Sequence, residues 1–155
     1  MTREDKYPNT DTFRFYNANP KNRITGDCVT RAISVATEED YNKIVMARAL
    51  VHIETGYDST VNEGISVLME KLGWTKMKQP KKPNGKKYTG KEWCKYLNKE
   101  YPEGVRMVAN IGGHHIVAIV PKVIDGKMKH RVYDIWDSTR KCIGNYWIKE
   151  QENRS

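Results

Sequence analysis

The hydrophobic pattern changes its period near residue 104, and this change most limits the folds open to the chain. Before it, apolar residues recur at helical spacing in segments that begin near Cys28, Thr37, Asn62 and Thr89. After it, the segments GVRMVANI, HHIVAIVP, KHRVYDIW and KCIGNYWI predict β-strands. Helices followed by a run of strands are typical of an α+β fold, with N-terminal helices packed on a C-terminal antiparallel sheet.

Local signals mark several helix starts. The stretches Thr37–Asp40 and Thr89–Glu92 have the form of a capping box, and Asp27 is a candidate N-cap for the first helix. Residues 1–24 show no clear period and carry turn residues, so we expect an irregular N-terminal segment.

Length and composition predict one domain spanning residues 1–155. Hydrophobic content is 38% and charged content 30%, which fits a soluble globular protein. No apolar run reaches membrane-spanning length, and the first residues lack the apolar core of a secretory signal, so we expect a cytoplasmic protein with no membrane partner.

The cysteines Cys28, Cys94 and Cys142 are odd in number and far apart. This spacing argues against a disulfide framework and fits a reducing compartment. The possible metal ligands are scattered and lack the spacing of a zinc site, so the sequence predicts neither a metal nor another cofactor.

The formal charge of +8 could attract nucleic acid, and much of it lies in the lysine-rich segment from Lys76 to Lys87. Proteins that bind single strands usually add aromatic side chains on which bases stack. This segment has none, so we expect a solvated loop and consider nucleic-acid binding the less favoured alternative.

Cys28 follows Gly26 and Asp27 and stands at a predicted helix start. Cysteine hydrolases need a thiolate nucleophile, a histidine that moves protons, and a polar group that orients the histidine. A helix N-terminus lowers the pKa of a cysteine, because its free N–H groups and dipole favour the anion. Cys28 is therefore the candidate nucleophile, whereas Cys94 and Cys142 are expected to be structural.

Four histidines could act as the base. His52 lies near the apolar stripe of the second predicted helix and is expected to be structural, and His130 lies in a charged hairpin arm. His114 and His115 follow two glycines and begin a strongly apolar strand. Bare glycines allow a substrate backbone to approach closely, so this doublet is the favoured location.

The turn after this strand indicates a partner for each histidine of the doublet. If Asp125-Gly126 is a two-residue hairpin turn, His115 is diagonal to Asp134, at a backbone distance of about 7–8 Å. His114 then lies opposite Asp137 on the other face of the sheet. Both pairs are self-consistent, and a single bulge would exchange them, so the pattern alone leaves both open.

Both faces of this strand are apolar. Val117 and Ile119 share the face of His115, and we expect them to line the side on which the helix of Cys28 packs. Ile116, Ala118 and Val120 form the other face.

The order of Cys on an early helix, His on a strand and Asp on the next strand resembles the papain-like cysteine peptidase superfamily. Gly26-Asp27-Cys28 is similar to the Gly-Ser-Cys of papain-type enzymes. Asp134-Ile135-Trp136 resembles their Asn-Ser-Trp, in which Asn orients the histidine and Trp shields it. The segment HIVAI from His115 is similar to the His-x-Val-Val of bacteriocin-processing peptidases, which use Asp as the third member.

This resemblance implies a papain-like cysteine hydrolase, a peptidase or amidase acting on a peptide or protein. It favours the pair His115 and Asp134, with Cys28 as nucleophile. Asn22 stands where the family has a glutamine, six positions before the cysteine, that helps form the oxyanion hole. The short chain is more similar to compact bacterial or bacteriophage members than to digestive enzymes.

Other functions use the same features. An acyltransferase would need the same residues, and a catalytically silent papain-like protein of a phage or mobile element could bind a host target. The third alternative is a nucleic-acid-associated basic module. Arg31, one helical turn after Cys28, could steady the thiolate, but we expect it to pair with Asp27 or Glu38. The oligomeric state is left open.

Overall fold

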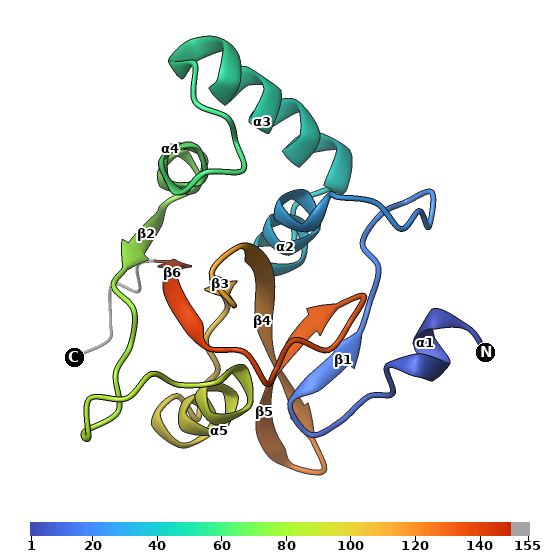
Figure 1. Ribbon diagram of the computed structural model, residues 1–155, viewed down its shortest axis with the longest axis vertical. Coiled ribbons are helices and arrows are strands. Elements are labelled where there is room, and N and C mark those ends of the chain that lie inside the picture. The colour runs from blue at the N-terminus through green and yellow to red at the C-terminus, as the bar shows by residue number, and fades with distance from the viewer. Residues whose placement is uncertain (150–155) are drawn as a thin grey trace.

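The computed structural model describes residues 1–149, in which helices lie on both faces of one β-sheet (Figure 1). None of the helices within these residues is long and apolar enough to cross a membrane. The elements in chain order are α1 (Arg3–Lys6), β1 (Phe13–Phe15), α2 (Cys28–Thr37), α3 (Tyr41–Thr55), α4 (Asn62–Lys71), β2 (Trp74–Met77), α5 (Gly90–Glu100), β3 (Met107–Ile111), β4 (His115–Ile124), β5 (Lys127–Asp134) and β6 (Ile143–Lys149).

The six strands form a single sheet in the order β1-β5-β4-β3-β6-β2. The α+β class is confirmed, but the prediction of a purely antiparallel sheet is wrong, because β1 pairs with β5 in parallel and all other pairs are antiparallel. Strand β1 and helix α1 also lie in the segment 1–24 that was expected to be irregular. A three-residue strand is too short to show the alternation that identifies strands in sequence.

The hairpin of β4 and β5 has the predicted register. Asp125 and Gly126 both have positive φ, at 52° and 77°, as a two-residue turn of this kind requires. Pairing runs without a bulge from Ile124–Lys127 to Ala118–Tyr133. The register on which the candidate site depends is therefore confirmed over this stretch.

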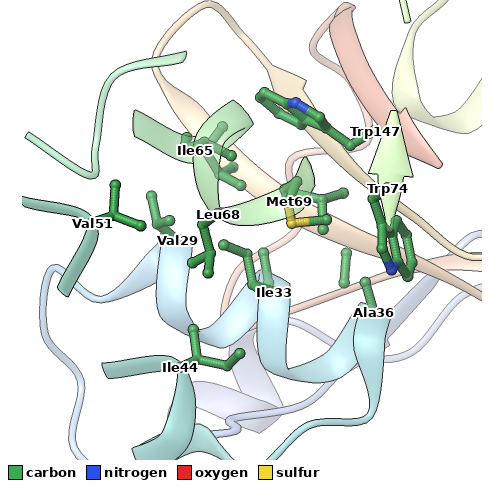
Figure 2. Packing of buried hydrophobic residues seen from close by; sticks show 14 of the residues in the cluster. Val29, Ile33, Ala36, Ile44, Val51, Ile65, Leu68, Met69, Trp74 and Trp147 are labelled. Atoms are coloured by element: carbon green, nitrogen blue, oxygen red, sulfur yellow. The ribbon is translucent and has the colours of Figure 1, made fainter. Parts of the chain in front are cut away.

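Each face of the sheet carries its own apolar cluster. Figure 2 shows one of them, in which Val29 and Ile33 of α2 pack near Leu68 and Met69 of α4. The second cluster lies on the other face, where Leu97 of α5 is fully buried. Complete burial of one such aliphatic side chain contributes about 1.5–3 kcal/mol, so these two clusters hold the helices on the sheet.

The predicted face for α2 is wrong. This helix packs with Ile116, Ala118 and Val120, whereas Val117 and Ile119 belong to the cluster on the α5 side. Because both faces of β4 are apolar, hydrophobic alternation could not distinguish them.

Of the two predicted capping boxes, one is present and the other is absent. Thr89 and Glu92 form the predicted capping box at the start of α5. The capping box predicted at Thr37–Asp40 is absent, since Thr37 is the last residue of α2. Asp40 alone caps α3, by accepting hydrogen bonds from the second and third backbone N–H groups of that helix.

The lysine-rich segment 76–87 is less irregular than expected. Its first two residues belong to β2, and Lys81 forms an antiparallel bridge with Lys87. Lys82 forms an ion pair with Glu92 of α5, so the segment is tied to a helix.

Candidate active site

Cys28, His115 and Asp134 come together at one end of the sheet. The Oδ2 atom of Asp134 lies 2.5 Å from Nε2 of His115, so the predicted contact between these two residues is confirmed. The imidazole also makes a side-chain hydrogen bond with the Cys28 thiol. Since Nε2 faces the carboxylate, Nδ1 is the ring nitrogen left for sulfur.

The three residues meet because each stands at the end of its element. Cys28 is the first residue of α2, His115 the first of β4, and Asp134 the last of β5. The ladder between β4 and β5 ends at Ala118–Tyr133, so His115 and Asp134 lie past the last pair that joins these two strands to each other. There, residues from the α5 face of the sheet can contact a helix that packs on the opposite face.

The surroundings of Cys28 favour the thiolate. Burial raises the pKa of the thiol, but the hydrogen bonds from His115 and from the backbone of Ile116 oppose it, and the charges of His115 and Arg31 act in the same direction. Together these contacts lower the pKa of Cys28 below its ordinary value.

The surroundings of His115 favour the imidazolium. Burial lowers its pKa, but the hydrogen bonds to Asp134 and Cys28 and their negative charges outweigh this effect and raise the pKa to about 9. A cysteine with a lowered pKa beside a histidine with a raised one shifts the proton equilibrium toward a thiolate–imidazolium pair.

Asp134 is buried and fully hydrogen-bonded. Only 2% of its side chain is exposed. Its Oδ1 accepts hydrogen bonds of 2.7 Å from the guanidinium of Arg31 and from the backbone N–H of Ile135, while Oδ2 faces His115. The carboxylate is therefore held in one orientation by partners on both of its oxygens.

Arg31 links this carboxylate to a second one. Its Nε lies 2.8 Å from Oδ1 of Asp27, which confirms one of the two predicted pairings. The Oδ2 of Asp27 accepts hydrogen bonds from the hydroxyl of Tyr41, at 2.6 Å, and from the amide of Asn19, at 3.1 Å. A continuous polar series thus runs from α3 to His115.

Glu38, the other predicted partner of Arg31, pairs with Arg106 instead, at 3.0 Å. Arg106 also donates hydrogen bonds to the carbonyl oxygens of Val35 and Ala36 in the last turn of α2. These bonds satisfy carbonyl groups that have no partner within the helix and fix the C-terminal end of α2.

Sequence reasoning missed the contact between Arg31 and Asp134. The pairing of Arg31 with Asp27 follows from their spacing of four residues, which places both on one side of a helix. Asp134 lies 103 residues from Arg31, so only the tertiary structure brings them together.

Trp136 covers the histidine. The centroid of its ring lies 4.9 Å from that of His115, with 39° between the two ring planes. This contact agrees with the shielding role that the resemblance implies for Trp136, because it reduces the access of water to the hydrogen bond between His115 and Asp134.

Asn22 makes no hydrogen bond with Cys28, His115 or Asp134 within residues 1–149. It stands in an exposed turn with a φ of 54°, and its Oδ1 is 3.4 Å from the side-chain nitrogen of Asn17. Within the same described residues, its Nδ2 has no acceptor.

The alternative pair is not in contact. His114 is exposed, and Oδ1 of Asp137 accepts hydrogen bonds from the backbone N–H and hydroxyl of Thr139. His52 is also exposed, with Nδ1 3.0 Å from the carbonyl oxygen of Tyr57 in the loop after α3.

The other cysteines differ in exposure. Cys94 is completely buried, as expected of a structural residue, whereas Cys142 is exposed just before β6. In the described part of the chain, no three His, Cys, Asp or Glu side chains are arranged to hold a metal ion.

No protein-family model matches the chain, and searches of curated proteins and of solved structures likewise found no match. The chemistry of the site is therefore argued from the residues that form it.

Proposed function

We propose that the protein is a papain-like cysteine hydrolase that cleaves an amide or related acyl bond in a peptide or protein. The observation that supports this most is the hydrogen-bonded series from Cys28 through His115 to Asp134. It starts at the first residue of a helix and combines a lowered thiol pKa with a raised imidazole pKa.

In the first half of the reaction, the thiolate of Cys28 attacks the carbonyl carbon and the carbonyl oxygen becomes an oxyanion. The backbone N–H of Cys28 is one of the free donors in the first turn of α2 and can bind that oxygen. We assign the second donor to the Nδ2 of Asn22, which has no acceptor within residues 1–149. Each such donor is typically worth about 2.7–4 kcal/mol.

His115 then gives its proton to the leaving amine, and the carbon–nitrogen bond breaks to leave an acyl group on Cys28. Water attacks this acyl group while His115 takes a proton from the water, which releases the acid and restores the thiolate. Asp134 keeps the ring in the orientation that both steps need. An amine that replaces water would make the same protein an acyltransferase.

An electrophilic acyl probe tests this proposal. We expect one covalent adduct, on Cys28, when the intact protein is treated near neutral pH and its peptides are mapped by mass spectrometry. The variant Cys28→Ala should give no adduct, whereas the control Cys142→Ala, which removes the exposed thiol, should react as the wild type does. Modification of Cys94 or Cys142 in preference to Cys28 would contradict the assignment.

A further inference from the structure

Arg48 of α3 is a half-buried cation next to the start of α2. Helix α3 lies beside α2 (Figure 1). The guanidinium donates hydrogen bonds from NH1 to the hydroxyl of Thr30, at 2.5 Å, and from Nε to the hydroxyl of Ser59, at 2.8 Å. Thr30 is itself buried, so the guanidinium is held in a fixed position.

Both other arginines at α2 have carboxylate partners, and Arg48 has none. Arg31 pairs with Asp27 and Asp134, and Arg106 pairs with Glu38. Within residues 1–149, no carboxylate oxygen lies within 4.0 Å of the Arg48 guanidinium. A half-buried cation that is hydrogen-bonded to hydroxyl groups and has no carboxylate in contact is only partly compensated, and a bound carboxylate would add to this compensation.

Arg48 lines a pocket of about 380 Å³ between α3, α2 and the loop that follows α3. Val45 and Ala49 supply aliphatic walls, which suit the methylene groups of an acidic side chain. Asp58 also lines the pocket, but its Oδ1 accepts two hydrogen bonds of 2.9 Å from Thr60.

The pocket lies close to the nucleophile. Thr30, which contacts the guanidinium, is the second residue after Cys28 on α2. Burial is the largest effect on the pKa of Arg48 and lowers it, and among the charges that oppose burial the thiolate of Cys28 is the largest. A group bound by Arg48 would therefore lie near a substrate that reaches Cys28.

We propose that Arg48 and its pocket bind a carboxylate of the substrate, so that the protein selects acyl substrates with an acidic group near the scissile bond. This inference rests on the proposed function, because it assumes that an acyl substrate reaches Cys28. The net charge of +8 also favours acidic substrates, since it attracts anions over longer distances.

Three peptide vinyl sulfones with the same electrophile test the proposal. One carries Glu beside the electrophile, the second carries Gln there, and the third carries Gln and a free terminal carboxylate. The rate of adduct formation on Cys28 is measured for each by mass spectrometry. We expect the wild type to react at least about tenfold faster with an acidic probe than with the neutral one, which corresponds to about 1.4 kcal/mol.

The variant Arg48→Gln should lose this preference, measured as the ratio of its rates with the acidic and neutral probes, because the ratio cancels any effect of the lost charge on the Cys28 thiolate. Lys43→Gln is the matched control, because it removes the same charge from an exposed position on α3 and should keep the preference. The faster of the two acidic probes shows whether the carboxylate comes from a side chain or from a chain end.

Equal rates for all three probes on Cys28 would overturn the role of Arg48 and leave the proposed hydrolase intact. Failure of every probe, together with iodoacetamide reacting no faster at Cys28 than at Cys142, would overturn both. If Arg48→Gln does not fold, the wild-type preference is measured at low and high salt. It should shrink as salt screens the charge, and an unchanged ratio would contradict the proposal.

Discussion

Two regions of the molecule each contain a cysteine and a histidine, and the pKa values of these side chains shift in opposite directions in the two regions. At the end of the sheet, Cys28 has a lowered pKa and His115 a pKa of about 9. On the α5 side, Cys94 has a strongly raised pKa and His130 a pKa of about 4. The first region favours the charged forms of both side chains, and the second favours the neutral forms.

The two regions differ in their pKa shifts because the hydrogen-bond and charge partners differ. Burial does not distinguish them, since it is the largest single effect on all four side chains and disfavours the charged form of each. His130 accepts a hydrogen bond of 3.0 Å from the backbone N–H of Val105, and its other ring nitrogen lies 2.9 Å from Oδ1 of Asn98. These partners are uncharged. A neighbouring carboxylate is what makes the buried His115 a cation.

The largest expected effect comes from removing the histidine of the reactive region. His115→Ala should reduce acyl-probe hydrolysis by about 10²-fold to 10⁴-fold, the usual contribution of a positioned acid–base group. His114→Ala should stay folded and retain most activity, because His114 is exposed and lies in the turn before β4. Circular dichroism checks folding before rates are compared. An inactive His114→Ala beside an active His115→Ala would show that the wrong histidine has been assigned.

The next effect concerns the carboxylates. Asp134→Ala should lower activity by about 10²-fold or more, because His115 loses the group that orients its ring. It should also destabilise the protein, since it removes one of the two carboxylates that compensate the buried Arg31. Asp137→Ala is the control and should be nearly neutral for activity. Steady-state hydrolysis and urea unfolding measure the two effects, and the reverse ranking for activity would refute the orienting role.

Thiol reactivity compares the two regions within one sample. Limited iodoacetamide treatment near neutral pH should modify Cys28 about tenfold faster than Cys142, because the thiolate is the reactive form, and should leave Cys94 unmodified. Peptide mapping gives the order of labelling. Because the pKa of Cys28 is lowered, its labelling rate should persist to a lower pH than that of a free cysteine, whose ordinary pKa is about 8.5. Should Cys142 be labelled first, the charged pair at Cys28 would not be present.

The smallest effects are changes in stability with pH, and the two histidines should act in opposite directions. The pKa of His115 is raised to about 9, so its contribution is present below its ordinary value of 6.5 and is lost as the pH rises toward 9. The pKa of His130 is lowered to about 4, so its contribution is present above 6.5 and is lost as the pH falls toward 4.

Urea midpoints measured across this range test these slopes. His115→Gln should flatten the alkaline side of the stability profile, and His130→Gln the acid side. Each variant serves as the control for the other. If both variants flatten the same side, the assignment of one charged and one neutral histidine is wrong.

Sequence reasoning succeeded where neighbouring residues decide the structure. The Asp125-Gly126 turn set the register of β4 and β5, because few residue pairs adopt positive φ at both turn positions. That register brought His115 and Asp134 to the same side of the hairpin. The capping box at Thr89 is a similar local success.

Sequence reasoning failed where contacts between segments far apart in the chain decide the structure. Strand β1 consists of three residues and is recognisable only through its parallel pairing with β5. The face on which α2 packs depends on the tertiary arrangement, since both faces of β4 are apolar. Arg31 had a visible partner in Asp27, but its second partner, Asp134, became evident only in the folded chain.

The order of the site residues along the chain has a consequence for biosynthesis. The proposed nucleophile is residue 28, while His115 and Asp134 are made only near the end of the described chain. A ribosome therefore releases Cys28 long before its partners, and until they arrive its thiol has the ordinary pKa of about 8.5 and is mostly protonated in the cell. The contacts that lower the pKa of Cys28 form only when β4 has packed against α2, so the proposed thiolate chemistry starts only after this part of the chain has folded.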